Sequence, residues 1–173
     1  VTLQGEEHGK GLARVLAAVP NTVPDLPAAF LVRPRLLNEL KVAALSADGT
    51  KRAALTSEKA KHKSAVHGMG GVGKTTLAVA LVSDREVRGA FDKICWVSVG
   101  QEPDTAMLQQ VLHIQLAGRS LSSEAAGNEQ VALVELKEAA STSGASVLLV
   151  LDDVWDASHA APLNFVDPSA RGS

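Results

Sequence analysis

The glycine-rich segment 68–76, with the sequence GMGGVGKTT, restricts the possible folds of this chain more than any other part of it. Its glycines permit left-handed backbone angles and let backbone N–H groups approach an anion closely. A short strand is predicted at residues 65–67 before it and a helix at 75–83 after it, which is the setting that a phosphate-binding loop requires. The N-terminus of such a helix carries about +0.5 charge and favours phosphate. The pattern therefore predicts a P-loop rather than a glycine-rich turn with a chance lysine.

The side chains at the end of this loop have predicted roles of their own. Lys74 is expected to reach the β- and γ-phosphate oxygens, Thr75 to offer its hydroxyl to Mg²⁺, and Thr76 to contact the α-phosphate side. The predicted cofactor-binding residues of the loop are Gly68, Met69, Gly70, Gly71, Val72, Gly73, Lys74, Thr75 and Thr76.

Two adjacent acids form the second candidate feature. Asp152 and Asp153 follow the apolar run 148–151, which resembles a Walker B strand. Ligands of open α/β sheets bind at the carboxyl ends of the strands, so an acid there would face an ion bound at the P-loop. We expect Asp152 to hold Mg²⁺ directly or through water, and Asp153 to orient or deprotonate an attacking water. The alternative is a surface Asp-Asp turn.

From residue 64 onward, predicted strands and helices alternate, which indicates a parallel sheet with helices on both faces. The expected elements are strands at 93–99 and 146–151 and helices at 104–116 and 128–140, the first of these helices with Met107 among its inward residues. The predicted fold class is α/β, a three-layer P-loop NTPase sandwich that stops after the Walker B strand.

The N-terminal part has weaker patterns. Residues 1–27 are predicted to be a flanking segment and linker, with apolar residues at helical spacing up to Val19 and a proline-rich stretch after it. Residues 28–63 are predicted to contain a helix starting at Pro34, followed by an exposed lysine-rich connection over 50–63. Residues 64–173 would then be the partial NTPase core. The start at Val1 and the end at Ser173 suggest a piece of a longer protein.

Composition excludes several classes of protein. The net charge of −2 and the scattered basic residues disfavour nucleic acid as a partner, and no apolar run approaches the roughly 20 residues of a membrane span. Cys95 is the only cysteine, so no internal disulfide can form and a cytoplasmic setting is expected. We predict that Cys95, Trp96, Trp155 and His113, like His67, have packing roles rather than catalytic or metal-binding ones.

Three blocks together resemble the NB-ARC family, the nucleotide switch domains of plant resistance proteins and of the apoptosome activator. They are the loop 68–78, the block 91–99 with the sequence FDKICWVSV, and the acid block 148–155 that ends in Asp-Asp-Val-Trp. The terminal Arg171-Gly172-Ser173 is similar to the start of the family's next strand block. The chain lacks the guanine-reading motif of GTPases, and Met69 replaces the second lysine of partition ATPases, so adenine is the favoured base.

The resemblance implies a STAND-type switch, in which ADP holds a closed monomer and exchange for ATP drives oligomerisation with other domains of the same protein. It also implies that the segment before the P-loop, here Phe30, Leu31, Val32 and Arg33, contacts adenine. The family's Gly-Leu-Pro segment and its Met-His-Asp histidine are not in this sequence, so hydrolysis would be slow at most.

Two other interpretations remain open. A conventional P-loop ATPase or small-molecule kinase would need an acceptor pocket and a lid rich in arginine, for which only the scattered Arg85, Arg88 and Arg119 are available. A degenerate fragment that folds poorly is the other, because three strands leave an exposed sheet edge.

Overall fold

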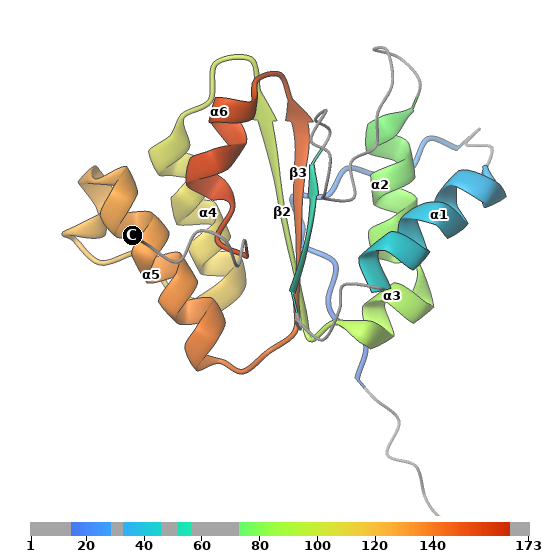
Figure 1. Ribbon diagram of the computed structural model, residues 1–173, viewed down its shortest axis with the longest axis horizontal. Coiled ribbons are helices and arrows are strands. Elements are labelled where there is room, and N and C mark those ends of the chain that lie inside the picture. Colours follow the sequence, from blue (N-terminus) through green and yellow to red (C-terminus); the bar gives the residue numbers. More distant parts are fainter. Residues whose placement is uncertain (1–14, 29–32, 46–51, 57–72, 167–173) are drawn as a thin grey trace, which may run out of the picture.

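The structure is a computed structural model, and it describes residues 15–28, 33–45, 52–56 and 73–166. Within these residues a parallel sheet of three strands lies between two layers of helices (Figure 1). The mixed helix and strand architecture with a small parallel sheet is the one expected for a P-loop NTPase fold.

The sheet has the strand order β1-β3-β2, with β3 (Val147–Val154) in the centre. It pairs in parallel with β1 (Arg52–Thr56) on one side and with β2 (Lys93–Gly100) on the other. Both predicted strands over 93–99 and 146–151 are confirmed. All six residues from Val147 to Asp152 are buried, because helices cover both faces of β3.

The exposed connection predicted over residues 50–63 is wrong for residues 52–56, which form strand β1. Its apolar centre, residues 53–55, is only three residues long and lies among lysines and arginines, so it carries no periodic signal. Pairing with the buried strand β3 decides its conformation. The strand predicted at residues 65–67, which includes His67, lies outside the described residues.

One face of the sheet is covered by the helices α1 to α3, to the right of the sheet in Figure 1. We call it the α2 face; its core contains Leu81, Trp96 and Val150. The helices are α1 (Pro34–Leu45), α2 (Lys74–Ser83) and α3 (Arg85–Ala90). The predicted helices at Pro34 and over 75–83 are confirmed, whereas α3 is too short to show a period in the sequence.

The other face, which we call the α4 face, is covered by the helices on the left in Figure 1. Its core contains Leu112, Leu136 and Leu149. The elements are α4 (Thr105–Ala117), η1 (Ala125–Gly127), α5 (Glu129–Thr142), α6 (Ala157–Ala160) and η2 (Ala161–Leu163). The helices predicted at 104–116 and 128–140 are confirmed, with Asp104 and Asn128 as their N-caps. The inward placement predicted for Met107 is wrong, since 56% of it is exposed.

A segment of irregular chain, residues 16–23, also packs on the α2 face, and we call it the N-terminal strap. The helical spacing predicted up to Val19 does not form a helix over residues 15–20. Instead Ala17 and Arg88 exchange two hydrogen bonds of 2.8 Å, from the Ala17 N–H to the Arg88 carbonyl and from Arg88 Nε to the Ala17 carbonyl. Thr22 Oγ1 donates to the carbonyl of Trp96 in β2 at 3.0 Å. The strap thus joins α3 to strand β2.

Helices in the described ranges are too short to cross a bilayer, since the longest, α5, has 14 residues against the roughly 20 that a span needs.

Candidate functional site

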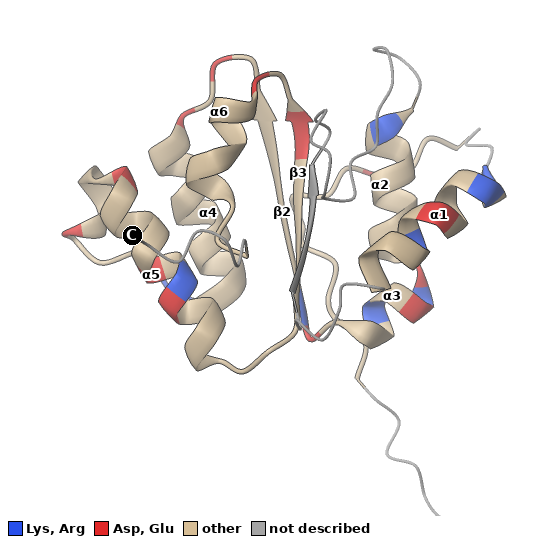
Figure 2. Cartoon of the chain, in the orientation of Figure 1, with Lys and Arg blue, Asp and Glu red and all other residues tan. Residues whose placement is uncertain are grey.

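The start of helix α2 and the carboxyl end of strand β3 lie at the same edge of the sheet. Figure 2 shows a basic segment at the start of α2 and an acidic segment at the end of β3, both at the upper edge in that view. Thr75 Oγ1 donates a hydrogen bond of 3.0 Å to Asp152 Oδ1. The structure therefore brings together two residues that lie 77 positions apart in the sequence and that were predicted to share one ion.

Gly73 gives helix α2 its N-terminus. Its φ of 80° and ψ of 32° are left-handed, a conformation that glycine adopts without the steric cost of a Cβ atom. It is the N-cap of α2, no side chain caps the first turn, and no acid lies in that turn. This end of α2 is therefore a suitable place for an anion.

Asp152 is the buried carboxylate of the site, with 7% of the residue exposed. Burial raises the pKa of Asp152, and this effect outweighs the hydrogen bonds from Thr75 and from the Asp153 backbone, which lower it. Lys74 also lowers this pKa by its charge. A second positive charge beside Asp152, such as a divalent cation, would favour the ionised form further.

The oxygens of Thr75 and Asp152 fit a magnesium ion. Mg²⁺ takes oxygen ligands at about 2.1 Å in octahedral geometry, so two neighbouring ligands lie about 3 Å apart. The Thr75 hydroxyl and the Asp152 carboxylate already have that separation. No group of three or more metal-ligating His, Cys, Asp or Glu side chains occurs in the described residues. A magnesium site made of one carboxylate, one hydroxyl and nucleotide phosphates does not need such a group.

Asp153 differs from Asp152 in its environment. It is exposed, and it has a φ of 54°, the only positive φ of a non-glycine residue in the described ranges. Trp155 Nε1 donates to Asp153 Oδ1 at 3.0 Å. The two acids are part of strand β3 rather than a turn beyond it.

The predicted packing role of Trp155 is wrong. The residue is 63% exposed, whereas Trp96, for which the same role was predicted, is 1% exposed and lies in the core of the α2 face. Trp155 follows the last residue of β3, where the burial of the strand has already decreased at Asp153 and Val154. A pattern of apolar residues cannot distinguish these two tryptophans, and the adjacent Asp-Asp pair was the signal that set Trp155 apart.

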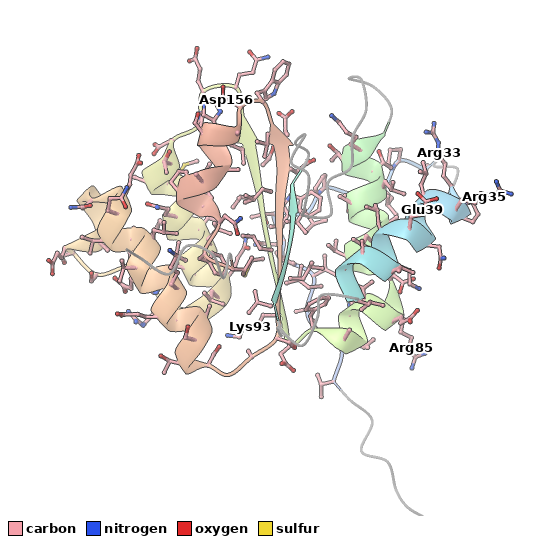
Figure 3. All side chains as sticks on the ribbon, in the orientation of Figure 1. Arg33, Arg35, Glu39, Arg85, Lys93 and Asp156 are labelled. Atoms are coloured by element: carbon pink, nitrogen blue, oxygen red, sulfur yellow. The ribbon has the colours of Figure 1, made fainter. Side chains whose placement is uncertain are left out.

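Of the remaining predicted site residues, some lie in the part of the chain that the structure describes and others do not. Gly68, Met69, Gly70, Gly71, Val72 and Val32 lie outside the described residues. Thr76 lies in the first turn of α2 and is partly exposed. Arg33 is exposed just before α1, and Figure 3 shows its side chain on the outer side of the molecule. The structure does not bring Arg33 to Asp152.

Cys95 and His113 have the packing roles that were predicted for them. Cys95 is buried, and burial raises the pKa of its thiol to about 12, so it stays protonated at neutral pH. His113 is fully buried, with Nδ1 2.9 Å from the carbonyl oxygen of Arg119 and Nε2 3.5 Å from Glu135 Oε1.

Comparison with known proteins identifies the family of this chain. Residues 52–171 match the NB-ARC domain. A putative disease resistance protein of Arabidopsis thaliana is 34% identical over 108 residues, which are 62% of this chain and 12% of that protein. The disease resistance RPP13-like protein 1 of the same plant is 35% identical over 96 residues, 56% of this chain and 9% of that protein. The disease resistance protein RGA2 of Solanum bulbocastanum is 36% identical over 89 residues, 51% of this chain and 9% of that protein.

The chain thus spans about a tenth of the length of the curated relatives it matches. The family match begins at Arg52, the first residue of strand β1, and includes α2 and both acids. Since it covers more than half of the chain, the protein belongs to the NB-ARC family and carries that family's nucleotide-binding module.

Proposed function

We propose that this chain binds ADP and ATP together with Mg²⁺ at the edge formed by helix α2 and strand β3. The observation that carries the proposal is the 3.0 Å contact between Thr75 at the start of α2 and the buried carboxylate of Asp152. A buried acid that receives the hydroxyl of a P-loop threonine is a suitable magnesium ligand, and the adjacent Lys74 supplies positive charge for phosphate.

Each residue has a proposed role at this site. The backbone of Gly68 to Gly73 surrounds the phosphates, Lys74 binds the β- and γ-phosphate oxygens, and Thr76 contacts the α-phosphate side. Thr75 and Asp152 hold Mg²⁺, which neutralises phosphate charge when it is bound. Asp153 orients the attacking water, and Val32 and Arg33 contact adenine.

We propose further that the module is a switch of a larger plant defence protein, since the relatives that it resembles are disease resistance proteins. ADP would hold the closed monomer, and ATP would open it for assembly with other copies through further domains of the same protein. Hydrolysis of ATP would be slow. The cytoplasm is the proposed compartment, because Cys95 is the only cysteine of this sequence and no internal disulfide can form.

Titration of fluorescent ADP and ATP into the purified chain, with and without Mg²⁺, tests the binding proposal. Lys74→Ala should weaken both nucleotides by about 100-fold, because it leaves phosphate charge uncompensated. Arg85→Ala is the matched control: Arg85 is exposed and lies at the opposite edge of the sheet (Figure 3), so its removal should leave affinity unchanged. Asp152→Asn, which keeps the shape of the side chain, should abolish the dependence of ATP binding on Mg²⁺.

Equal affinities in the wild type, Lys74→Ala and Arg85→Ala would contradict the proposed site.

Light scattering of the full-length protein loaded with ADP or ATP tests the switch. A larger assembly with ATP supports it, whereas rapid multiple turnover with no change of assembly would indicate a conventional ATPase or kinase.

A further inference from the structure

The end of strand β3 has an unusual backbone at Asp153. Its φ of 54° is left-handed, and regular strands have negative φ at every residue. Asp tolerates this region better than most residues, but a left-handed residue at the end of a buried strand still turns its side chain out of the regular alternation. The neighbouring strand β2 also ends in a left-handed residue, Gly100 with φ 78°, whose register partner is Val154. Both strands therefore change direction at the same level of the sheet.

This backbone separates the two acids of the site. Asp152 points to the start of α2 and receives the hydroxyl of Thr75. Asp153 receives the indole N–H of Trp155 on its Oδ1 at 3.0 Å. Each carboxylate thus has its own side-chain donor: Thr75 of helix α2 for Asp152, and Trp155, which follows strand β3, for Asp153.

Trp155 is held by this hydrogen bond while most of its surface faces water. It is 63% exposed, and an indole of that size is usually buried for its apolar area. A hydrogen bond to a carboxylate is stronger than one between neutral groups, and it fixes the direction of the acceptor. The contact therefore orders the side chain of Asp153 at a position where neighbouring packing does not.

We propose that Trp155 is a positioning residue for Asp153, resting on the proposed nucleotide site: its indole N–H holds Oδ1 and leaves Oδ2 for the attacking water. In the reaction that this arrangement serves, the water oxygen bonds to the γ-phosphorus while the bond from phosphorus to the bridging oxygen breaks. ADP leaves with the electron pair of that bond, and Asp153 accepts the water proton and returns it to the phosphate. In this arrangement Trp155 acts only through Asp153 and contacts neither the attacking water nor the nucleotide.

The chain contains a matched control for this proposal. Trp96 is buried, and its indole N–H has no hydrogen-bond partner among the described residues. Trp155→Phe removes a hydrogen bond and keeps an aromatic ring, whereas Trp96→Phe makes the same chemical change without removing a hydrogen bond. Asp153→Asn and the double variant Trp155→Phe/Asp153→Asn complete the set.

The experiment measures two affinities in every variant: that for Mg–ADP, and that for Mg–ADP with fluoroaluminate, which imitates the phosphoryl group under attack by water. Single-turnover hydrolysis of bound ATP is measured beside them. Trp155→Phe should leave Mg–ADP affinity within about twofold and lower both the fluoroaluminate affinity and the hydrolysis rate by about tenfold, the effect of one hydrogen bond. In the Asp153→Asn background the same change should have no further effect, and Trp96→Phe should change neither affinity.

Equal losses of both affinities in Trp155→Phe, or an effect that persists in Asp153→Asn, would show that Trp155 acts by packing and would overturn the inference. A wild-type chain that binds Mg–ADP but gains nothing from fluoroaluminate would also overturn it, while the proposed nucleotide site would stand. A wild-type chain that binds no nucleotide would overturn both.

Discussion

The two faces of the sheet are completed by different parts of the chain. The α4 face has its buried core in residues 95–166, all within the family match. The core of the α2 face also contains Ala17 and Leu40, and Val19, Val23 and Leu37 pack against it. These five residues lie before residue 52, where the family match begins. The face that carries the proposed nucleotide site thus depends on residues that a family comparison alone would leave out.

Ion pairs and hydrogen bonds, as well as apolar contacts, attach the strap and α1 to the rest of the α2 face. Lys41 of α1 forms ion pairs with Asp84 at 3.1 Å and with Glu86 at 2.7 Å, at the junction of α2 and α3. Gln115 of α4 binds the backbone of Trp96 in β2 at both its N–H and its carbonyl, and also donates to Thr22 of the strap. The strap and α4 therefore meet at strand β2.

The largest effect is expected from removing residues 1–45, which keeps the whole family match. The deletion removes the five residues named above and Ala44, and it exposes the apolar surface of the α2 face that these residues cover. At about 1.5–3 kcal/mol for each large apolar side chain, the loss is roughly 5 kcal/mol or more, comparable with the stability of a typical domain. Urea unfolding followed by circular dichroism measures it. An unchanged midpoint would show that the α2 face is complete without this segment.

Much of this organisation could be predicted from sequence patterns. For the parts that could not be predicted, there is a physical reason. Helix α4 is long enough for its period to be visible, strand β3 is marked by a continuous apolar run, and the P-loop threonine and Asp152 are close together as their motifs predicted. Strand β1 is short and gains its conformation from pairing with β3. The exposure of Trp155 and the left-handed φ of Asp153 occur at the end of β3, where burial decreases, and hydrophobicity alone cannot predict that position.

Two matched leucine truncations compare the faces directly. Leu112→Ala, in the α4 face, leaves a cavity at a fully buried position and should cost about 3–4 kcal/mol of unfolding free energy. Leu40→Ala, in α1, should cost about 2 kcal/mol, because Leu40 keeps 9% exposure and the cavity opens towards solvent. Urea midpoints of the two variants measure these two losses of stability. No loss at all in Leu40→Ala would show that α1 does not contribute to the core of the α2 face.

A smaller effect is expected at the contact between the strap and α4. Gln115 Oε1 accepts the Trp96 N–H at 2.7 Å, so Gln115→Ala leaves that N–H without its partner and should cost about 1–3 kcal/mol. Thr22→Ala alone should cost about 1 kcal/mol, and the two losses should not add, because both side chains bind the Trp96 carbonyl. A double-mutant cycle by thermal unfolding measures the coupling. Strict additivity would mean that the strap and α4 act independently.

The smallest effect is expected in acid, at the junction of α1 and α3. Burial raises the pKa of Asp84, but the hydrogen bonds from Lys41 and from the backbone of Val87 and Glu86 lower it more, so the net pKa is below its usual value. A lowered carboxyl pKa contributes stability that is present above the unfolded value and is lost as pH falls through the folded value. The contribution of Asp84 should therefore begin to decline below about pH 4 and be lost once the pH is below the folded pKa.

Asp84→Asn isolates this effect, since Asn is an equally good N-cap for α3 and removes only the charge. Its urea midpoint should fall less than that of the wild type between about pH 5 and about pH 3, which is roughly one pH unit either side of the usual carboxyl pKa. At neutral pH the two proteins should differ by about 1 kcal/mol or less, as for an ordinary partly exposed ion pair. Parallel pH curves would exclude a contribution of the Asp84 charge.

The most direct test of the central claim is the shift in unfolding temperature on adding Mg–ADP to the whole chain. A ligand at about 1 mM with a dissociation constant of about 1 μM stabilises the folded state by about 4 kcal/mol, which is a shift of several degrees. We expect that shift in the wild type and in Arg85→Ala, and a shift about a third as large in Lys74→Ala, because binding that is about 100-fold weaker leaves about 1.4 kcal/mol of stabilisation at the same ligand concentration. A cooperative unfolding transition at the same temperature with and without Mg–ADP in all three proteins would contradict the account.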